Sequence, residues 1–169
     1  ALTMKTISIP AVNMIEGRLP LTYMNELNAH IDENRHKRND YSNHLVGQIK
    51  QHELSEQLDL DRNAPVVKSL LEILAVGGKR LIQSMSIFPF PPDQYDAIPI
   101  ECFSAWTVHS YAGDYNPLHD HDVSYDKKVM SFSCILYCKV PPQIEAIDES
   151  NTSFYENSGV TDGSPHFVW

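Results

Sequence analysis

A proline-rich connector divides this sequence into two parts with different hydrophobic patterns. The run Phe88-Pro89-Phe90-Pro91-Pro92 cannot form a regular helix, because proline lacks an amide N–H and restricts the residue before it. Apolar residues recur at helical spacing before the connector, whereas aromatic and β-branched residues dominate after it. We therefore expect an α+β protein with a helical part over residues 1–92 and a β-rich part over residues 93–169. A length of 169 residues suits a single domain with a buried core.

Two helices are predicted before the connector. The first follows Pro20 and ends near Asn34, because apolar residues recur three or four positions apart at Leu21, Met24, Leu27 and Ile31. The second begins at Asn63-Ala64-Pro65, a capping asparagine followed by a proline in the first turn. Gly77-Gly78 is expected to break or bend this second helix. A short strand is predicted over Lys5 to Pro10, where polar and apolar residues alternate.

Two strands are predicted after the connector. Glu101 to Tyr111 is rich in aromatic and β-branched residues, and Ala112-Gly113-Asp114 is a turn signal that follows it. Val129 to Val140 has the strongest strand pattern in the chain, because its residues alternate between two faces. Pro141-Pro142 is expected to end this strand.

The charge balance argues against nucleic acid as the main partner. A net charge of −9 is unfavourable for phosphate binding, which needs a basic face, so we do not expect a duplex nucleic acid as substrate. The one dense basic run, Arg35-His36-Lys37-Arg38, is flanked by acidic residues. This setting favours a solvated helix end over a phosphate site.

The cysteine content and the hydropathy indicate the compartment. The chain has three cysteines, so at least one stays unpaired in any intramolecular scheme. This favours free thiols in a reducing compartment, the cytoplasm. No apolar run approaches the length of a transmembrane helix, so no membrane partner is expected.

The segment from Tyr115 to Asp122 carries the side chains best suited to bind a metal. Imidazole and carboxylate together suit Fe(II) better than Ca²⁺ or Mg²⁺, which prefer oxygen ligands. Residues two apart on an extended segment point to the same side, so His119 and His121 could share one metal. Asp120 and Asp122 form the alternative frame, or they serve as hydrogen-bond partners that fix an imidazole tautomer. Taken alone, the segment favours a solvated loop over a metal site.

Three segments in order resemble a known group of enzymes. They are Trp106-Thr107-Val108, the stretch from Pro117 to His121, and the stretch from Ser131 to Pro141. This order is similar to 2-oxoglutarate/Fe(II)-dependent oxygenases found widely in marine phages and bacteria. In that group a Trp-bearing strand leads to a Pro-x-His-x-His segment, and a strand with Ser, Phe, Tyr, Lys and Pro follows. His44 to Ile49 and Ser158 to Phe167 add to the similarity.

The resemblance implies a fold, two cofactors and a set of site residues. The fold is a double-stranded β-helix, or jelly-roll, with N-terminal helices packed against its major sheet. The cofactors are Fe(II) and 2-oxoglutarate, which with O₂ hydroxylate a bound substrate whose identity stays open. His119 and His121 match the metal positions of the group. Five further residues could line the pocket or contact the co-substrate, or they are ordinary barrel or loop residues: Tyr111, Asn116, Ser131, Ser133 and Tyr137.

The sequence also departs from the group. The group's distal His and the Arg or Lys that holds the co-substrate lie in later strands, after a segment that is not found before Trp169. The resemblance therefore implies a C-terminally truncated member that carries half of the metal site, in the host cytoplasm if it is phage-encoded. A catalytically inactive cupin-like binding or structural module is the alternative. A hydrolase or isomerase that uses another divalent metal is a third possibility.

Overall fold

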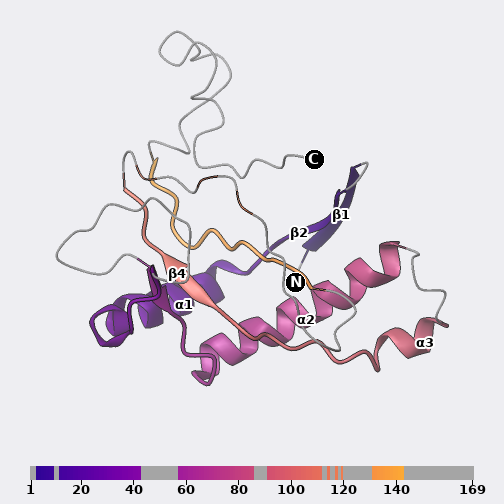
Figure 1. Ribbon diagram of the computed structural model, residues 1–169, viewed down its shortest axis with the longest axis horizontal. Helices are drawn as coiled ribbons and strands as arrows, with labels where there is room; N and C mark the ends of the chain where they lie inside the picture. The colour runs from indigo at the N-terminus through magenta and orange to yellow at the C-terminus, as the bar shows by residue number, and fades with distance from the viewer. Residues whose placement is uncertain are drawn as a thin grey trace, which may run out of the picture. The chain divides into compact units, whose positions relative to one another are not determined.

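The computed structural model describes residues 3–9, 12–42, 57–85, 91–111, 114, 117, 119 and 131–142 (Figure 1). The chain divides into two compact units, Ala1–Cys134 and Ile135–Trp169. All the named helices and strands of the described residues belong to the first unit. None of the helices in this described part is long and apolar enough to cross a membrane.

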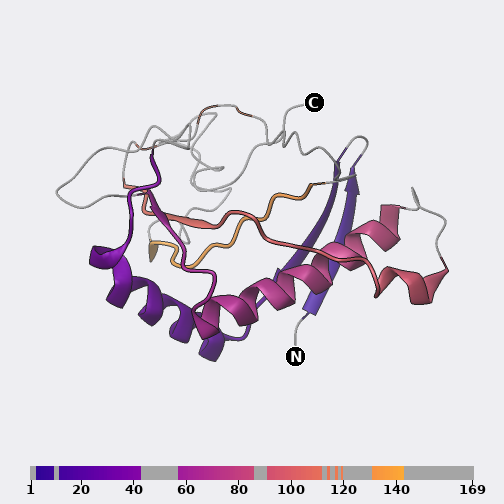
Figure 2. The same cartoon turned by 60° about the horizontal axis from the view of Figure 1, so that its bottom comes forward.

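An antiparallel hairpin begins the first unit. β1 (Thr3–Ile9) pairs with β2 (Val12–Arg18) in a register that runs from Thr3↔Arg18 to Ile9↔Val12. The strand predicted from Lys5 is therefore confirmed up to Ile9, and it begins two residues earlier than expected. β2 contacts α2, and Figure 2 shows the hairpin beside one end of that helix. The prediction missed β2.

Both predicted helices are present. α1 (Leu21–Asn34) ends at the predicted residue, and it buries Leu27 and Ile31, which lie four positions apart on one face. α2 (Pro65–Met85) begins at the predicted proline. The residue directly before it is Ala64, whose carbonyl accepts the Lys68 N–H at 2.8 Å, so Asn63 lies one position outside the cap. The core of the unit combines side chains from both helices and their neighbours: Leu27, Ile31, Leu58, Ala64, Val66, Val67, Leu70, Ile82 and Tyr95.

Gly77-Gly78 was predicted to break or bend α2, and no break is found, because the helix runs through both residues without interruption. Neither glycine has a positive φ. A Cβ added at Gly78 would lie 2.9 Å from Ile100 Cδ1, so the missing side chain makes room for a residue distant in sequence. The segment after α3 (Pro92–Tyr95) is also held to α2 by Lys79 Nζ, which donates to the Asp96 carbonyl at 2.5 Å.

A small sheet joins three distant segments. β3 (Gln57–Asp59) pairs antiparallel with β4 (Trp106–Val108), which places Leu58 opposite Thr107. On its other side β3 meets residues 39–41: Tyr41 N–H donates to Gln57 O at 2.7 Å, and Asp59 N–H donates to Asn39 O at 3.1 Å. The Tyr41 and Trp106 rings stack across this sheet, with centroids 5.7 Å apart. The strand predicted over Glu101 to Tyr111 is confirmed only at β4.

The strand predicted over Val129 to Val140 is not found in its described residues, 131–140. Residues 131–140 have no assigned strand, and residues 129 and 130 lie outside the described residues. Alternation describes which side chains would share a face, but a strand also needs a neighbour to pair with. The described strands amount to two pairs. The double-stranded β-helix core and the boundary at residue 92 therefore stay predictions.

Candidate functional site

His119 is the one predicted metal ligand that lies within the described residues. It is exposed, and its Nδ1 lies 2.8 Å from the carbonyl oxygen of Pro117. Because a carbonyl oxygen only accepts, Nδ1 carries the proton in this contact. The neutral ring then has its lone pair on Nε2, as a metal ligand requires. His121 lies outside the described residues, as do Asp120, Asp122 and Asn116.

A complete metal centre is not found in the part of the chain that the structure describes. No three His, Cys, Asp or Glu side chains gather there closely enough to hold an ion. The pairing of His119 with His121 is untested, because only His119 is described. The chemistry of His119 fits one ligand position of an Fe(II) site.

Tyr111 lies at the point where the chain leaves β4 and approaches the histidine segment. Its N–H donates to Asp114 Oδ2 at 2.9 Å, and Asp114 N–H donates to the Tyr111 carbonyl at 3.0 Å. These two bonds confirm the predicted turn at its two ends. The Tyr111 hydroxyl accepts a hydrogen bond from Arg35 Nη2 at 3.2 Å, although the residue is 46% exposed. Tyr111 therefore connects the end of α1 to this turn.

The three other predicted co-substrate residues are exposed. Ser131 and Ser133 belong to the first unit, whereas Tyr137 belongs to the second. Partial burial of the Tyr137 ring raises the pKa of its hydroxyl. The shared strand face on which these residues were expected to lie is not formed over residues 131–140. Their contact with a co-substrate stays a prediction.

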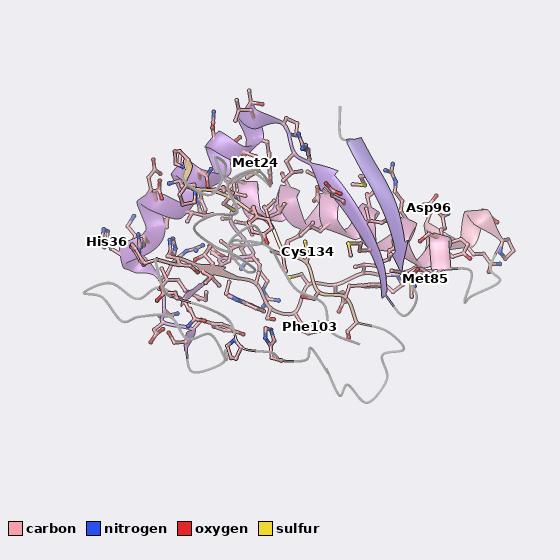
Figure 3. The ribbon with its side chains drawn as sticks, turned by 90° about the horizontal axis from the view of Figure 1, so that it is seen from above. Met24, His36, Met85, Asp96, Phe103 and Cys134 are labelled. Carbon is pink, nitrogen blue, oxygen red and sulfur yellow. The ribbon has the colours of Figure 1, made fainter. Side chains whose placement is uncertain are left out.

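The basic run after α1 is exposed in part. η1 (Arg35–Lys37) is a single 3₁₀ turn. His36 and Lys37 are exposed as expected, and Figure 3 shows His36 at the end of α1, pointing away from the ribbon. Arg35 and Arg38 are half-buried, so these two side chains are only partly exposed to solvent.

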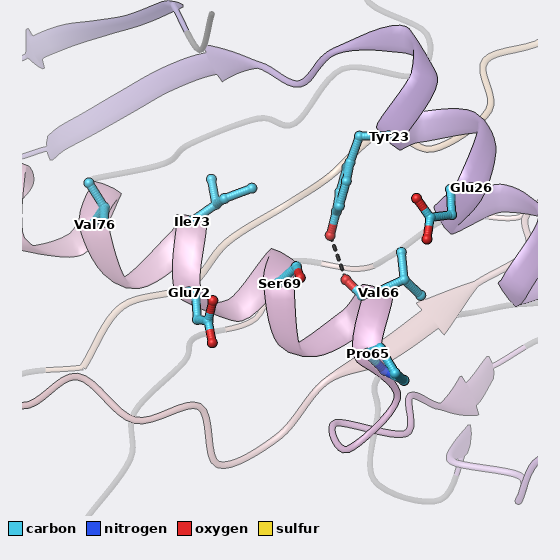
Figure 4. Close-up of a pocket in the computed structure, with 8 residues that line it drawn as sticks. All are labelled: Tyr23, Glu26, Pro65, Val66, Ser69, Glu72, Ile73 and Val76. Carbon is cyan, nitrogen blue, oxygen red and sulfur yellow. Dashed lines mark hydrogen bonds between the residues drawn. The ribbon is translucent and has the colours of Figure 1, made fainter.

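An open groove between α1 and α2 was not predicted (Figure 4). It has a volume of about 550 Å³. Tyr23 reaches across from α1 and donates its hydroxyl hydrogen to the Val66 carbonyl at 2.5 Å. Burial and the nearby Glu26 both raise the pKa of Tyr23. Glu26 and Glu72 line the groove together with apolar side chains, so it favours positively charged groups.

The three cysteines of the chain lie within the described residues. Cys102, Cys134 and Cys138 are not joined by disulfides. Burial raises the pKa of the Cys138 thiol, which lowers the fraction of reactive thiolate at neutral pH.

Comparison of the chain with protein-family models, with curated proteins and with solved structures finds no match to any of them.

Proposed function

We propose that this protein is a 2-oxoglutarate/Fe(II)-dependent dioxygenase that hydroxylates a substrate of unidentified class. One observation carries the proposal: the Pro117-x-His119-x-His121 segment lies between the Trp106 strand and the stretch from Ser131 to Pro141. The strand assignment of Trp106 in β4 and the Nδ1 contact of His119 are compatible with this reading. The proposal makes the protein an oxidoreductase with two cofactors.

The residues proposed to hold the metal are His119 and His121. When bound, Fe(II) would activate O₂ and 2-oxoglutarate would supply two electrons, so that one oxygen atom enters the substrate and the other enters the succinate that forms with CO₂. The chain's own contribution begins with orientation. The Pro117 carbonyl holds the His119 ring in one tautomer, and the Tyr111–Asp114 turn fixes where the segment leaves β4.

The proposal is tested by anaerobic titration of the full-length protein with Fe(II), followed by 2-oxoglutarate. We expect paramagnetic broadening of the His119 and His121 ring signals, and a metal-to-ligand charge-transfer band when the co-substrate is added. His119→Ala should abolish the broadening of the His121 ring signals and the charge-transfer band. The matched control is His36→Ala, which removes an exposed imidazole and should leave both signals unchanged. A band of equal intensity in His119→Ala, or no broadening at either histidine, contradicts the proposal.

A cupin-like binding module without oxygenase chemistry is the second candidate. Residues 81–169 contain no Arg, and His166 is the one histidine between residues 122 and 169. Such a module would show metal-dependent broadening at His119 but no charge-transfer band with 2-oxoglutarate. The same titration therefore separates the two candidates.

A further inference from the structure

The groove between α1 and α2 exposes apolar surface to water. Val66, Ile73 and Val76 line it from α2, where they recur at helical spacing and so lie on one side of the helix. Val76 is 46% exposed, and Ile73 is half-buried. A ligand whose hydrocarbon part covers these side chains would gain free energy, because apolar surface is removed from water.

Two carboxylates lie in the same groove. Glu26 comes from α1 and Glu72 from α2, and both side chains are exposed (Figure 4). Among the described residues, neither carboxylate forms a hydrogen bond or an ion pair. No Lys, Arg or His is among the residues that line the groove. The negative charge of its walls is therefore not neutralised from within, and the groove attracts cations.

Tyr23 ties the two walls of the groove together. Its side chain extends from α1, and its hydroxyl donates to the Val66 carbonyl of α2 at 2.5 Å. Burial raises the pKa of Tyr23, and the charge of Glu26 raises it further, so the carboxylate acts on the tyrosine at close range. The groove is thus held open by a specific contact, with an acidic side chain beside it.

The size of the groove favours a small molecule over a partner helix. One turn of an α-helix, about 10 Å across and about 5 Å long, fills roughly 400 Å³. The groove has a volume of about 550 Å³, so it holds little more than one such turn. The same volume lies within the range of sites for small organic ligands, about 300–1,000 Å³.

We propose that this groove binds a small aliphatic amine. The hydrocarbon part of the amine lies on Val66, Ile73 and Val76, and its ammonium group faces Glu26 or Glu72. Binding is weak, with a dissociation constant on the order of millimolar, because solvent screens exposed carboxylates. The proposal does not rest on the proposed oxygenase function.

The test follows the backbone amide signals of the full-length protein by NMR during titration with hexylamine at constant ionic strength. We expect saturable shifts at Tyr23, Ser69 and Val76, which line the groove. Two control ligands each lack one of the required parts. Methylamine has the charge without the hydrocarbon chain, and hexanol has the chain without the charge. Each should bind at least about threefold more weakly than hexylamine.

A pair of double variants separates the groove from the general attraction of an acidic protein, whose net charge is −9. Glu26→Gln/Glu72→Gln should weaken hexylamine binding by about threefold or more. The matched control is Glu16→Gln/Glu33→Gln, which removes the same charge from two exposed residues outside the lining and should change the affinity by less than about 1.5-fold.

Four results would overturn the proposal. They are an equal loss of affinity in the two double variants, binding of methylamine as tight as that of hexylamine, binding of hexanol as tight as that of hexylamine, and the absence of saturable shifts at the groove. The comparison of the three ligands uses the wild-type protein alone, so it decides the question even if a variant does not fold.

Discussion

Replacing each glycine of the Gly77-Gly78 pair by alanine tests whether α2 is continuous. A glycine in a helix interior costs about 0.8–1.0 kcal/mol relative to alanine. A Cβ at Gly77 would meet no atom within 4 Å. Gly77→Ala should therefore raise the free energy of unfolding by close to the full amount.

Gly78→Ala should behave differently because its Cβ would lie 2.9 Å from Ile100 Cδ1. The contact is with the end of a flexible side chain, so Ile100 can move, at a cost of roughly 0.5–1.5 kcal/mol for an unfavourable rotamer. This cost is about as large as the gain in helix propensity. We therefore expect Gly78→Ala to have nearly the same free energy of unfolding as the wild type. It should be less stable than the Gly77→Ala variant by about 1 kcal/mol.

Urea denaturation of both variants, and of Gly78→Ala in an Ile100→Val background, measures these differences. Ile100→Val removes the Cδ1 atom, so alanine at position 78 should recover about 1 kcal/mol relative to Ile100→Val alone. Equal stabilisation by both alanines would show that the contact with Ile100 is not formed. Strong destabilisation by Gly77→Ala would show that the helix breaks at the glycines, and the continuous α2 would be refuted.

Two further predictions concern the packing of α1. Leu27→Ala should lower the free energy of unfolding, measured in urea, by about 2–5 kcal/mol because Leu27 is fully buried. Leu21→Ala is the control, because Leu21 is 75% exposed, and it should change the free energy of unfolding by less than about 0.5 kcal/mol. Equal effects would contradict the assignment of the buried face. Tyr23→Phe should cost about 1 kcal/mol at neutral pH through loss of the bond to the Val66 carbonyl. The raised pKa of Tyr23 means that the folded state holds its proton more tightly than the unfolded state, so its contribution is complete below pH ~10 and is lost as the pH rises above that value. The stability difference between wild type and Tyr23→Phe should therefore shrink in alkaline urea titrations, and a constant difference would contradict this account.

The two helices could be predicted because their signals are local. The recurrence of Leu27 and Ile31 describes one face of α1, and Pro65 marks the first turn of α2 without reference to any other segment. The role of Gly78 could not be predicted in this way. It depends on Ile100, which is 22 positions away and meets the helix only in the folded chain.

The strands depend even more than the helices on contacts between segments that are distant in sequence. β3 has only three residues, and its pairing with residues 39–41 and with β4 supplies what its own pattern lacks. Residues 131–140 have side chains that alternate between two faces, as in a strand, but no strand is assigned to them. The candidate site is similar. The residue types around His119 could be identified from the sequence, whereas the groove between α1 and α2 depends on a contact between Tyr23 and Val66, which are 43 positions apart.

The position of β3 has a consequence for how the chain reaches its native state. The hairpin of β1 and β2 closes over a short loop, but the contact between Leu58 and Thr107 spans 49 residues. Closing a long loop costs chain entropy before any pairing energy is gained. The helices and the hairpin should therefore form early, and the β3–β4 sheet should form in the slowest kinetic phase. Trp106, stacked on Tyr41, is a built-in fluorescent reporter of that last step.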